Sequence, residues 1–122
     1  MEDKKTILVV DDTTENIDVL VGILRGTYKV KAAISGEKAL KIAQKKPPDL
    51  ILLDIMMPEM DGYQVCEKLK TDPTTANIPI VFVTGMSQQF DQAKGMALGA
   101  KGYITKPIDP EKVKVIAQEI LA

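Results

Sequence analysis

Strand-type and helix-type patterns alternate along this chain without interruption, and this alternation restricts the fold more than any other feature. Short apolar runs predict five strands: Thr6–Val10, Tyr28–Ile34, Leu50–Leu53, Ile80–Val83 and Gly102–Thr105. Apolar residues at helical spacing predict the segments between and after them: Thr14–Arg25, a helix capped by Ser35, Gly62–Lys70, Gln88–Leu98 and a helix opened by Asp109-Pro110-Glu111. Strands joined by helices lie parallel, and a parallel sheet needs helices on both faces.

The pattern therefore predicts one α/β domain over residues 1–122. We expect a doubly wound (βα)5 fold whose five-stranded parallel sheet has the order 2-1-3-4-5, with helices on both faces. Lys29 and Lys31 interrupt the second apolar run, which is typical of an edge strand. In this topology, ligands bind at the carboxyl ends of the first and third strands.

Polar side chains end four of the predicted strands. These are Asp11 and Asp12 after the first strand, Asp54 after the third, Thr84 after the fourth and Lys106 after the fifth. Because the carboxyl ends of parallel strands share one edge of a sheet, we expect these side chains to lie together. A carboxylate at the end of a buried strand costs several kcal/mol unless it is paired or ligated. The sequence therefore predicts a site at this edge.

The charges of this site indicate a cation. Three aspartates and one lysine leave a formal charge of −2, which one divalent ion would neutralise. The chain has no His and one Cys, so a hard, oxygen-ligated ion such as Mg²⁺ fits better than zinc. A metal-bound carboxylate beside a lysine and a hydroxyl is suited to accept a phosphoryl group as an aspartyl phosphate.

Five segments in order resemble the receiver domain of two-component response regulators, and the resemblance spans Ile7 to Leu121. They are Val9-Val10-Asp11-Asp12, Asp54-Ile55-Met56-Met57-Pro58 with Asp61-Gly62, Val83-Thr84-Gly85, Leu98-Gly99-Ala100 and Tyr103-Ile104-Thr105-Lys106-Pro107. The resemblance implies that Asp54 is phosphorylated. It also implies that Mg²⁺ is held by Asp12, by Asp11 mainly through water, by Asp54 and by the backbone carbonyl of Met56.

The resemblance assigns the remaining polar positions as well. Lys106 would pair with the phosphoryl group, Thr84 would be drawn toward it, and Tyr103 would swing inward as Thr84 moves. The bond between Lys106 and Pro107 matches one that is usually cis in the family. Phosphorylation would then switch the face made by the fourth helix, the fifth strand and the last helix. Met56 and Met86 would flank the line of water attack and lengthen the lifetime of the phosphorylated state.

The implied partners are a sensor histidine kinase or phosphotransfer protein, with a small acyl phosphate as an alternative donor. Downstream we expect an effector protein or a fused output domain, and a homodimer through the switching face. The implied role is that of a regulatory phosphoacceptor that assists its own phosphorylation and dephosphorylation, not that of an enzyme. Since the fold should end where Leu121-Ala122 ends the chain, we expect no output domain here. The chain is then a single-domain regulator or a piece of a longer protein, and Leu53–Asp72 looks similar to receivers attached to cyclic-dinucleotide enzymes.

Other interpretations stay open. A haloacid-dehalogenase-like phosphatase also uses an aspartyl phosphate, but it needs a second, spaced acid that Asp11-Asp12-Thr13 lacks. A flavodoxin would need a phosphate loop after the first strand, and a receiver fold that takes no phosphate remains a third alternative. Structural roles are also open: Thr84 as a strand-end cap, Tyr103 as an edge aromatic, Asp11 as a first-turn acid and Lys106 as a surface lysine.

Composition excludes several classes of function. The 16 basic and 17 acidic residues give a net charge of −1 and form no basic stripe, so we expect no direct nucleic-acid binding. Lys4-Lys5 and Lys45-Lys46 are predicted to be solvated surface. No apolar run reaches membrane-spanning length, so we expect a cytoplasmic protein. Cys66 has apolar neighbours at helical spacing and is predicted to be a core residue.

Overall fold

The computed structural model describes residues 4–85 and 92–122. The strands are β1 (Thr6–Val10), β2 (Lys29–Ala33), β3 (Leu50–Asp54), β4 (Ile80–Thr84) and β5 (Gly102–Thr105). The helices are α1 (Thr14–Leu24), α2 (Gly36–Lys45), α3 (Gly62–Thr71), α4 (Gln92–Ala97) and α5 (Pro110–Leu121). All strand pairs are parallel and the sheet order is β2-β1-β3-β4-β5, which confirms the predicted doubly wound (βα)5 fold.

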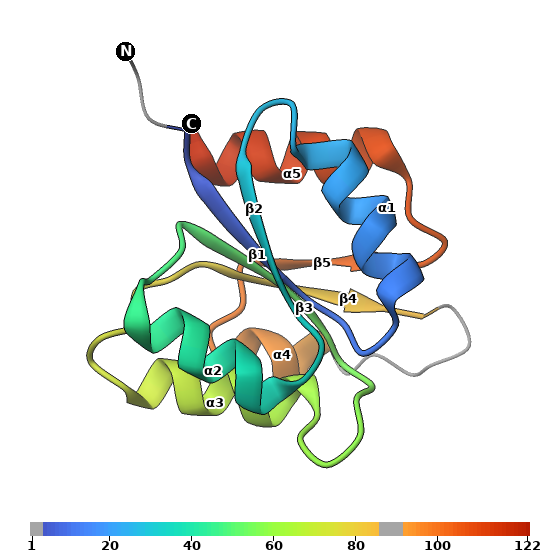
Figure 1. Ribbon diagram of the computed structural model, residues 1–122. Coiled ribbons are helices and arrows are strands. Elements are labelled where there is room, and N and C mark those ends of the chain that lie inside the picture. The colour runs from blue at the N-terminus through green and yellow to red at the C-terminus, as the bar shows by residue number, and fades with distance from the viewer. Residues whose placement is uncertain (1–3, 86–91) are drawn as a thin grey trace.

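Helices cover both faces of the sheet (Figure 1). Helices α1 and α5 lie on one face, where Ile17, Leu20 and Val113 pack against the sheet. Helices α2, α3 and α4 lie on the other face, where Val65 and Leu69 belong to a second apolar cluster. Strands β3 and β4 are buried along their whole length, because both of their faces are covered. The sheet therefore holds the ends of its central strands in a rigid position.

The edge strands show the pattern that the sequence predicts. Strand β2 is only partly buried and has β1 as its single neighbour in the sheet, as expected for a strand carrying Lys29 and Lys31. It is one residue shorter at each end than the predicted Tyr28–Ile34, whereas β3 and β4 extend to include Asp54 and Thr84. The two polar side chains are thus part of the strands themselves.

Helices α2 and α5 begin at side-chain caps that the sequence predicts. The Ser35 hydroxyl accepts a hydrogen bond from the backbone N–H of Lys38 (3.2 Å), and the Asp109 carboxylate accepts one from that of Glu111 (3.0 Å). Both caps were predicted. Helix α1 ends at Leu24, one residue before the predicted Arg25. Helix α4 is described from Gln92, so its predicted start at Gln88 lies outside the described residues.

Cys66 is fully buried on α3, as predicted for a core residue, and burial raises the pKa of its thiol to about 11. No helix in the described ranges is both long enough and apolar enough to cross a bilayer.

Candidate functional site

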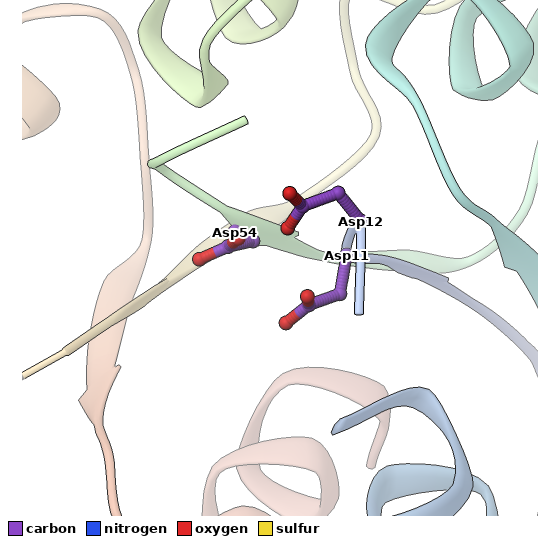
Figure 2. A group of neighbouring side chains, drawn as sticks. All are labelled: Asp11, Asp12 and Asp54. Atoms are coloured by element: carbon purple, nitrogen blue, oxygen red, sulfur yellow. The ribbon is translucent and has the colours of Figure 1, made fainter. Parts of the chain in front are cut away.

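Three carboxylates converge at the carboxyl edge of the sheet. Asp11, Asp12 and Asp54 each place one oxygen within 4.8 Å of the others. Figure 2 shows the first two side chains leaving adjacent positions after β1 and lying beside Asp54 at the end of β3. Asp11 and Asp54 are 1% and 2% exposed, whereas Asp12 is exposed. The structure thus brings together the acids that the sequence predicts to lie together.

Strand register explains this convergence. In the parallel pairing of β1 with β3, Val10 lies opposite Leu53, so Asp11 and Asp54 follow at neighbouring positions. The backbone N–H of Asp11 also donates to the carbonyl of Ala33 (3.1 Å), which continues the pairing with β2. One oxygen of the Asp11 carboxylate accepts a hydrogen bond from the backbone N–H of Thr13 (2.8 Å), just before α1 begins. Asp11 therefore supports the start of α1 and faces the site at once.

Lys106 reaches the same cluster from the end of β5. Its Nζ lies 3.2 Å from Oδ2 of Asp11 and 3.4 Å from Oδ1 of Asp54. Its backbone N–H donates to the carbonyl of Thr84 (2.7 Å), and its bond to Pro107 is cis, as predicted. With these contacts and a side chain that is only 24% exposed, Lys106 is not a mere surface lysine.

One lysine contacts two buried aspartates in this site, and this imbalance of charge shifts their pKa values. Burial, together with the neighbouring charge of Asp11, raises the pKa of Asp54 from 3.8 to about 6, and Lys106 offsets only part of this rise. Burial by itself would lower the pKa of Lys106, but the charges of Asp54 and Asp11 outweigh it and raise that pKa. A raised pKa favours the charged form of Lys106 but the neutral form of Asp54, and both follow from one ammonium facing two buried carboxylates. The lysine is held charged, while Asp54 is left short of positive charge.

Thr84 lies at the end of β4 and is 2% exposed. Its Oγ1 is buried and finds no hydrogen-bond partner among the residues that the structure describes. A buried polar atom left in this state costs about 1–3 kcal/mol, so the hydroxyl is available to a group that enters the site. A strand-end cap, the structural alternative for Thr84, would need a hydrogen bond to its hydroxyl, and none is present in the described ranges.

The remaining site candidates, Tyr103 and Met56, have more exposed side chains than Asp11, Asp54 and Thr84. Tyr103 lies on β5 opposite Phe82 of β4 and is 39% exposed. The side chain of Met56 follows β3 and is 57% exposed. Met86, the second methionine expected to flank the line of water attack, lies outside the described residues.

The start of α3 packs against the backbone of Asp54, a contact that no pattern in the sequence predicts. A Cβ atom on Gly62 would collide with the carbonyl oxygen of Asp54 and lie 2.8 Å from Cα of Ile55. The N–H of Gly62 donates to the carbonyl of Ile55 (2.8 Å). Asp61 forms a capping box with Gln64 through two 2.9 Å hydrogen bonds. The spacing Asp-x-x-Gln is the sequence signal for it.

The donor set of the site suits a hard divalent cation. The three candidate metal ligands that converge here are all carboxylates, and oxygen ligands of this kind are those that Mg²⁺ prefers. Lys106 alone leaves the cluster with an excess of negative charge. The residues present therefore fit Mg²⁺, and the buried hydroxyl of Thr84 adds a donor for an anionic ligand beside it.

Comparison with known proteins identifies the family. The chain matches the family model described as "Response regulator receiver domain" over residues 7–118. It is 48% identical over 104 residues to response regulator PleD of Caulobacter vibrioides, covering 84% of this chain and 23% of PleD. It is 41% identical over 118 residues to the alkaline phosphatase synthesis transcriptional regulatory protein PhoP of Bacillus subtilis, covering 96% of this chain and 48% of PhoP.

A solved structure supports the fold at full length. The chain superimposes on a putative response regulator from Chloroflexus aurantiacus with a TM-score of 0.91 and 33% identity, covering 98% of both chains. By contrast, the chain spans less than half the length of each of the two curated relatives, PleD and PhoP. Because one of them is a transcriptional regulator, the prediction that nucleic acid is not bound gains no support from these relatives.

Proposed function

The chain belongs to the response regulator receiver domain family of two-component signalling, and on this premise we propose that Asp54 is its phosphoacceptor. The observation that carries the proposal is the position of Asp54. It is buried at the end of β3, with Lys106 at 3.4 Å and with the carboxylates of Asp11 and Asp12 beside it. Asp11 is also buried and lies 3.2 Å from Lys106, but its other carboxylate oxygen already accepts a hydrogen bond from the backbone N–H of Thr13 (2.8 Å).

The proposed reaction is a transfer of a phosphoryl group. A carboxylate oxygen of Asp54 attacks the phosphorus, and the bond from phosphorus to the donor's histidine nitrogen or acyl oxygen breaks. With a pKa of about 6, Asp54 is mostly ionised at neutral pH and is ready to act as the nucleophile. Lys106 is held by two carboxylates, so its ammonium is already in place to pair with the incoming phosphoryl oxygens.

The same geometry supports a Mg²⁺ site. Asp12 and Asp54, with the backbone carbonyl of Met56 and with Asp11 through water, are the groups that we expect to hold the ion. When bound, Mg²⁺ neutralises phosphoryl oxygens that would otherwise repel the carboxylates. Asp12 is the exposed member of the cluster and therefore the one that a hydrated ion reaches first.

We further propose that the phosphorylated state is read by Thr84 and Tyr103. A phosphoryl group replaces about one negative charge by nearly two and adds acceptor oxygens. The hydroxyl of Thr84, which has no partner in the part of the chain that the structure describes, can donate to one of them and so pull the end of β4 toward the site. Tyr103 lies on the neighbouring strand, β5, and is the aromatic residue placed to follow this movement.

The output surface is then the face formed by α4, β5 and α5. It carries the exposed apolar side chains of Met96, Tyr103 and Val115, and a hollow of about 540 Å³ between β5 and α5.

An effector protein, a fused output domain or a second copy of the chain would bind there, and a histidine kinase or phosphotransfer protein would supply the phosphoryl group. We propose a regulatory, cytoplasmic domain and no catalysis on an external substrate.

Intact-mass measurement after incubation with acetyl phosphate and Mg²⁺ tests the acceptor. Wild type and the matched control Asp18→Asn, whose carboxylate is exposed on α1, should each gain one phosphoryl group, and Asp54→Asn should gain none. Equal uptake by Asp54→Asn would refute the assignment. Absence of uptake by wild type would favour the alternative of a receiver fold that takes no phosphate.

Amide chemical shifts before and after phosphorylation test the switch. We expect changes to extend from residues next to Asp54 to α4, β5 and α5. Changes confined to the immediate neighbours of Asp54 would contradict a switch through Thr84 and Tyr103.

A further inference from the structure

Strand β2 borders a hollow at the edge of the sheet that the phosphoacceptor site does not use. Its volume is about 510 Å³, and it is lined by Lys31 and Ala32 of β2 and by Ile42, Lys45 and Lys46 at the end of α2. In the sequence, these lysines are separated pairs or single residues that look like ordinary surface. The packing of α2 beside β2 brings them to one place.

The charge of this hollow is uncompensated. Lys31, Lys45 and Lys46 form no ion pair with any residue in the ranges 4–85 and 92–122, and no acidic side chain lines the hollow. The nearby Lys41 differs, because Glu37 pairs with it at 3.5 Å on the same helix. Three ammonium groups without an ion-pair partner in the described ranges, with Ile42 among them, make an environment that attracts an anionic partner.

The backbone of β2 offers a second element of recognition. The N–H of Lys29 donates to the carbonyl of Lys5 (2.9 Å), and the carbonyl of Ala33 accepts from the N–H of Asp11 (3.1 Å). In a strand, successive residues direct their backbone groups to opposite sides, so Val30 and Ala32 point theirs away from β1. Strand β2 is an edge of the sheet, and these groups therefore face outward beside the lysines.

We propose that an extended, acidic segment of a partner protein adds to β2 as a further strand of the sheet. Its main chain would pair with the outward groups of Val30 and Ala32, and carboxylates at alternate positions would reach Lys31, Lys45 and Lys46. Lysines on an edge strand discourage pairing with an identical edge, so a second copy of this chain is a poor occupant. The carboxylates of an acidic strand would instead form ion pairs with these lysines.

The location gives this surface a separate role from the proposed output face. Strands β2 and β5 are the two opposite edges of the sheet. A partner strand on β2 therefore leaves α4, β5 and α5 free. Strand β2 itself pairs with β1, which is followed by Asp11 and Asp12. A kinase or an effector with an acidic extended segment could thus be tethered at one edge while the other edge changes state.

The test uses a capped ten-residue peptide in which Glu alternates with Thr, titrated into the whole chain and followed by amide chemical shifts. We expect saturable binding with the largest changes at Val30 and Ala32. Replacing Lys31, Lys45 and Lys46 with Gln should weaken binding at least tenfold. A control with Lys68, Lys101 and Lys114 replaced by Gln, all exposed elsewhere on the molecule, should change it less than twofold.

Ala32→Pro separates strand addition from simple charge attraction. Proline removes an N–H that faces away from β1, so the pairing with β1 remains while the outward ladder is lost. We expect at least a tenfold loss of peptide binding with an otherwise unchanged amide spectrum. Unchanged binding by Ala32→Pro, binding of inorganic tripolyphosphate but not of the peptide, or no binding of the peptide at millimolar concentration would each overturn the proposal.

Discussion

Replacing Asp54 with Asn should stabilise the metal-free protein at neutral pH. Asp54 is 2% exposed, and its pKa is raised from 3.8 to about 6, mainly by burial and then by the charge of Asp11. A raised pKa in the folded state means that ionisation of Asp54 opposes folding. Asn has nearly the same shape and carries no charge, so it removes this penalty.

The magnitude follows from the shift of the pKa. A difference of about 2 units corresponds to about 3 kcal/mol at about 1.36 kcal/mol per unit. Between pH 4 and pH 6 the folded protein binds more protons at this position than the unfolded chain does, so stability falls as the pH rises. The penalty is complete above pH 6 and is largely absent below pH 4. The stability gap between Asp54→Asn and wild type should therefore widen by about 2–3 kcal/mol from pH 4 to pH 7.5.

Urea unfolding in the presence of a chelator, repeated across this pH range, measures the gap directly. Only the difference between variant and wild type is compared, so ionisations of groups that do not interact with Asp54 cancel. Asp18→Asn is the matched control, because its carboxylate is exposed on α1 and should show no such pH-dependent gap. A gap for Asp54→Asn that stays constant from pH 4 to pH 7.5 would refute the reasoning that burial makes Asp54 a costly charge.

Three further variants test other contacts of the site. Mg²⁺ at a hundred times its dissociation constant should stabilise wild type by about 2.7 kcal/mol, and Asp12→Asn should lose most of this gain in a thermal shift titration while Asp18→Asn keeps it. Thr84→Val removes a buried hydroxyl that has no partner among the described residues, and it should raise the free energy of unfolding by about 1 kcal/mol. The same variant should shrink the chemical shift changes in β5 on phosphorylation, and a loss of stability would show that the hydroxyl has a partner. Gly62→Ala should lower the free energy of unfolding by about 2 kcal/mol through collision with the Asp54 backbone, whereas Gly22→Ala, with open space around it, should raise it by up to about 1 kcal/mol.

The fold and the position of the acids could be predicted from the sequence, because both depend on local pattern. Apolar runs and helical spacing define the elements, and parallel strands deliver their last residues to one edge. Asp11 and Asp54 are neighbours for this reason alone, as the register of Val10 with Leu53 shows. Several element ends differ from the prediction by one residue; Asp54 and Thr84, for example, remain in their strands through pairing with neighbouring strands.

Features that depend on packing between distant elements could not be predicted. The approach of Gly62 to the Asp54 backbone requires the path of the loop before α3, and only the capping box has a signal in the sequence. That the Thr84 hydroxyl has no partner among the described residues depends on every neighbour of β4. Likewise, Lys31 lies near Lys45 and Lys46 only because α2 packs beside β2. The prediction that Lys45 and Lys46 are solvated surface therefore says nothing of the hollow that the three lysines share.

Localisation of the phosphoryl group tests the central claim most directly. Acyl phosphates are reduced by borohydride, which converts a phosphorylated aspartate into homoserine, and peptide sequencing by mass spectrometry then identifies the position. After incubation with acetyl phosphate and Mg²⁺, we predict homoserine at position 54 and unmodified aspartate at positions 11 and 12. Homoserine at either of those positions, or a stable phosphate ester on Thr84, would contradict the account.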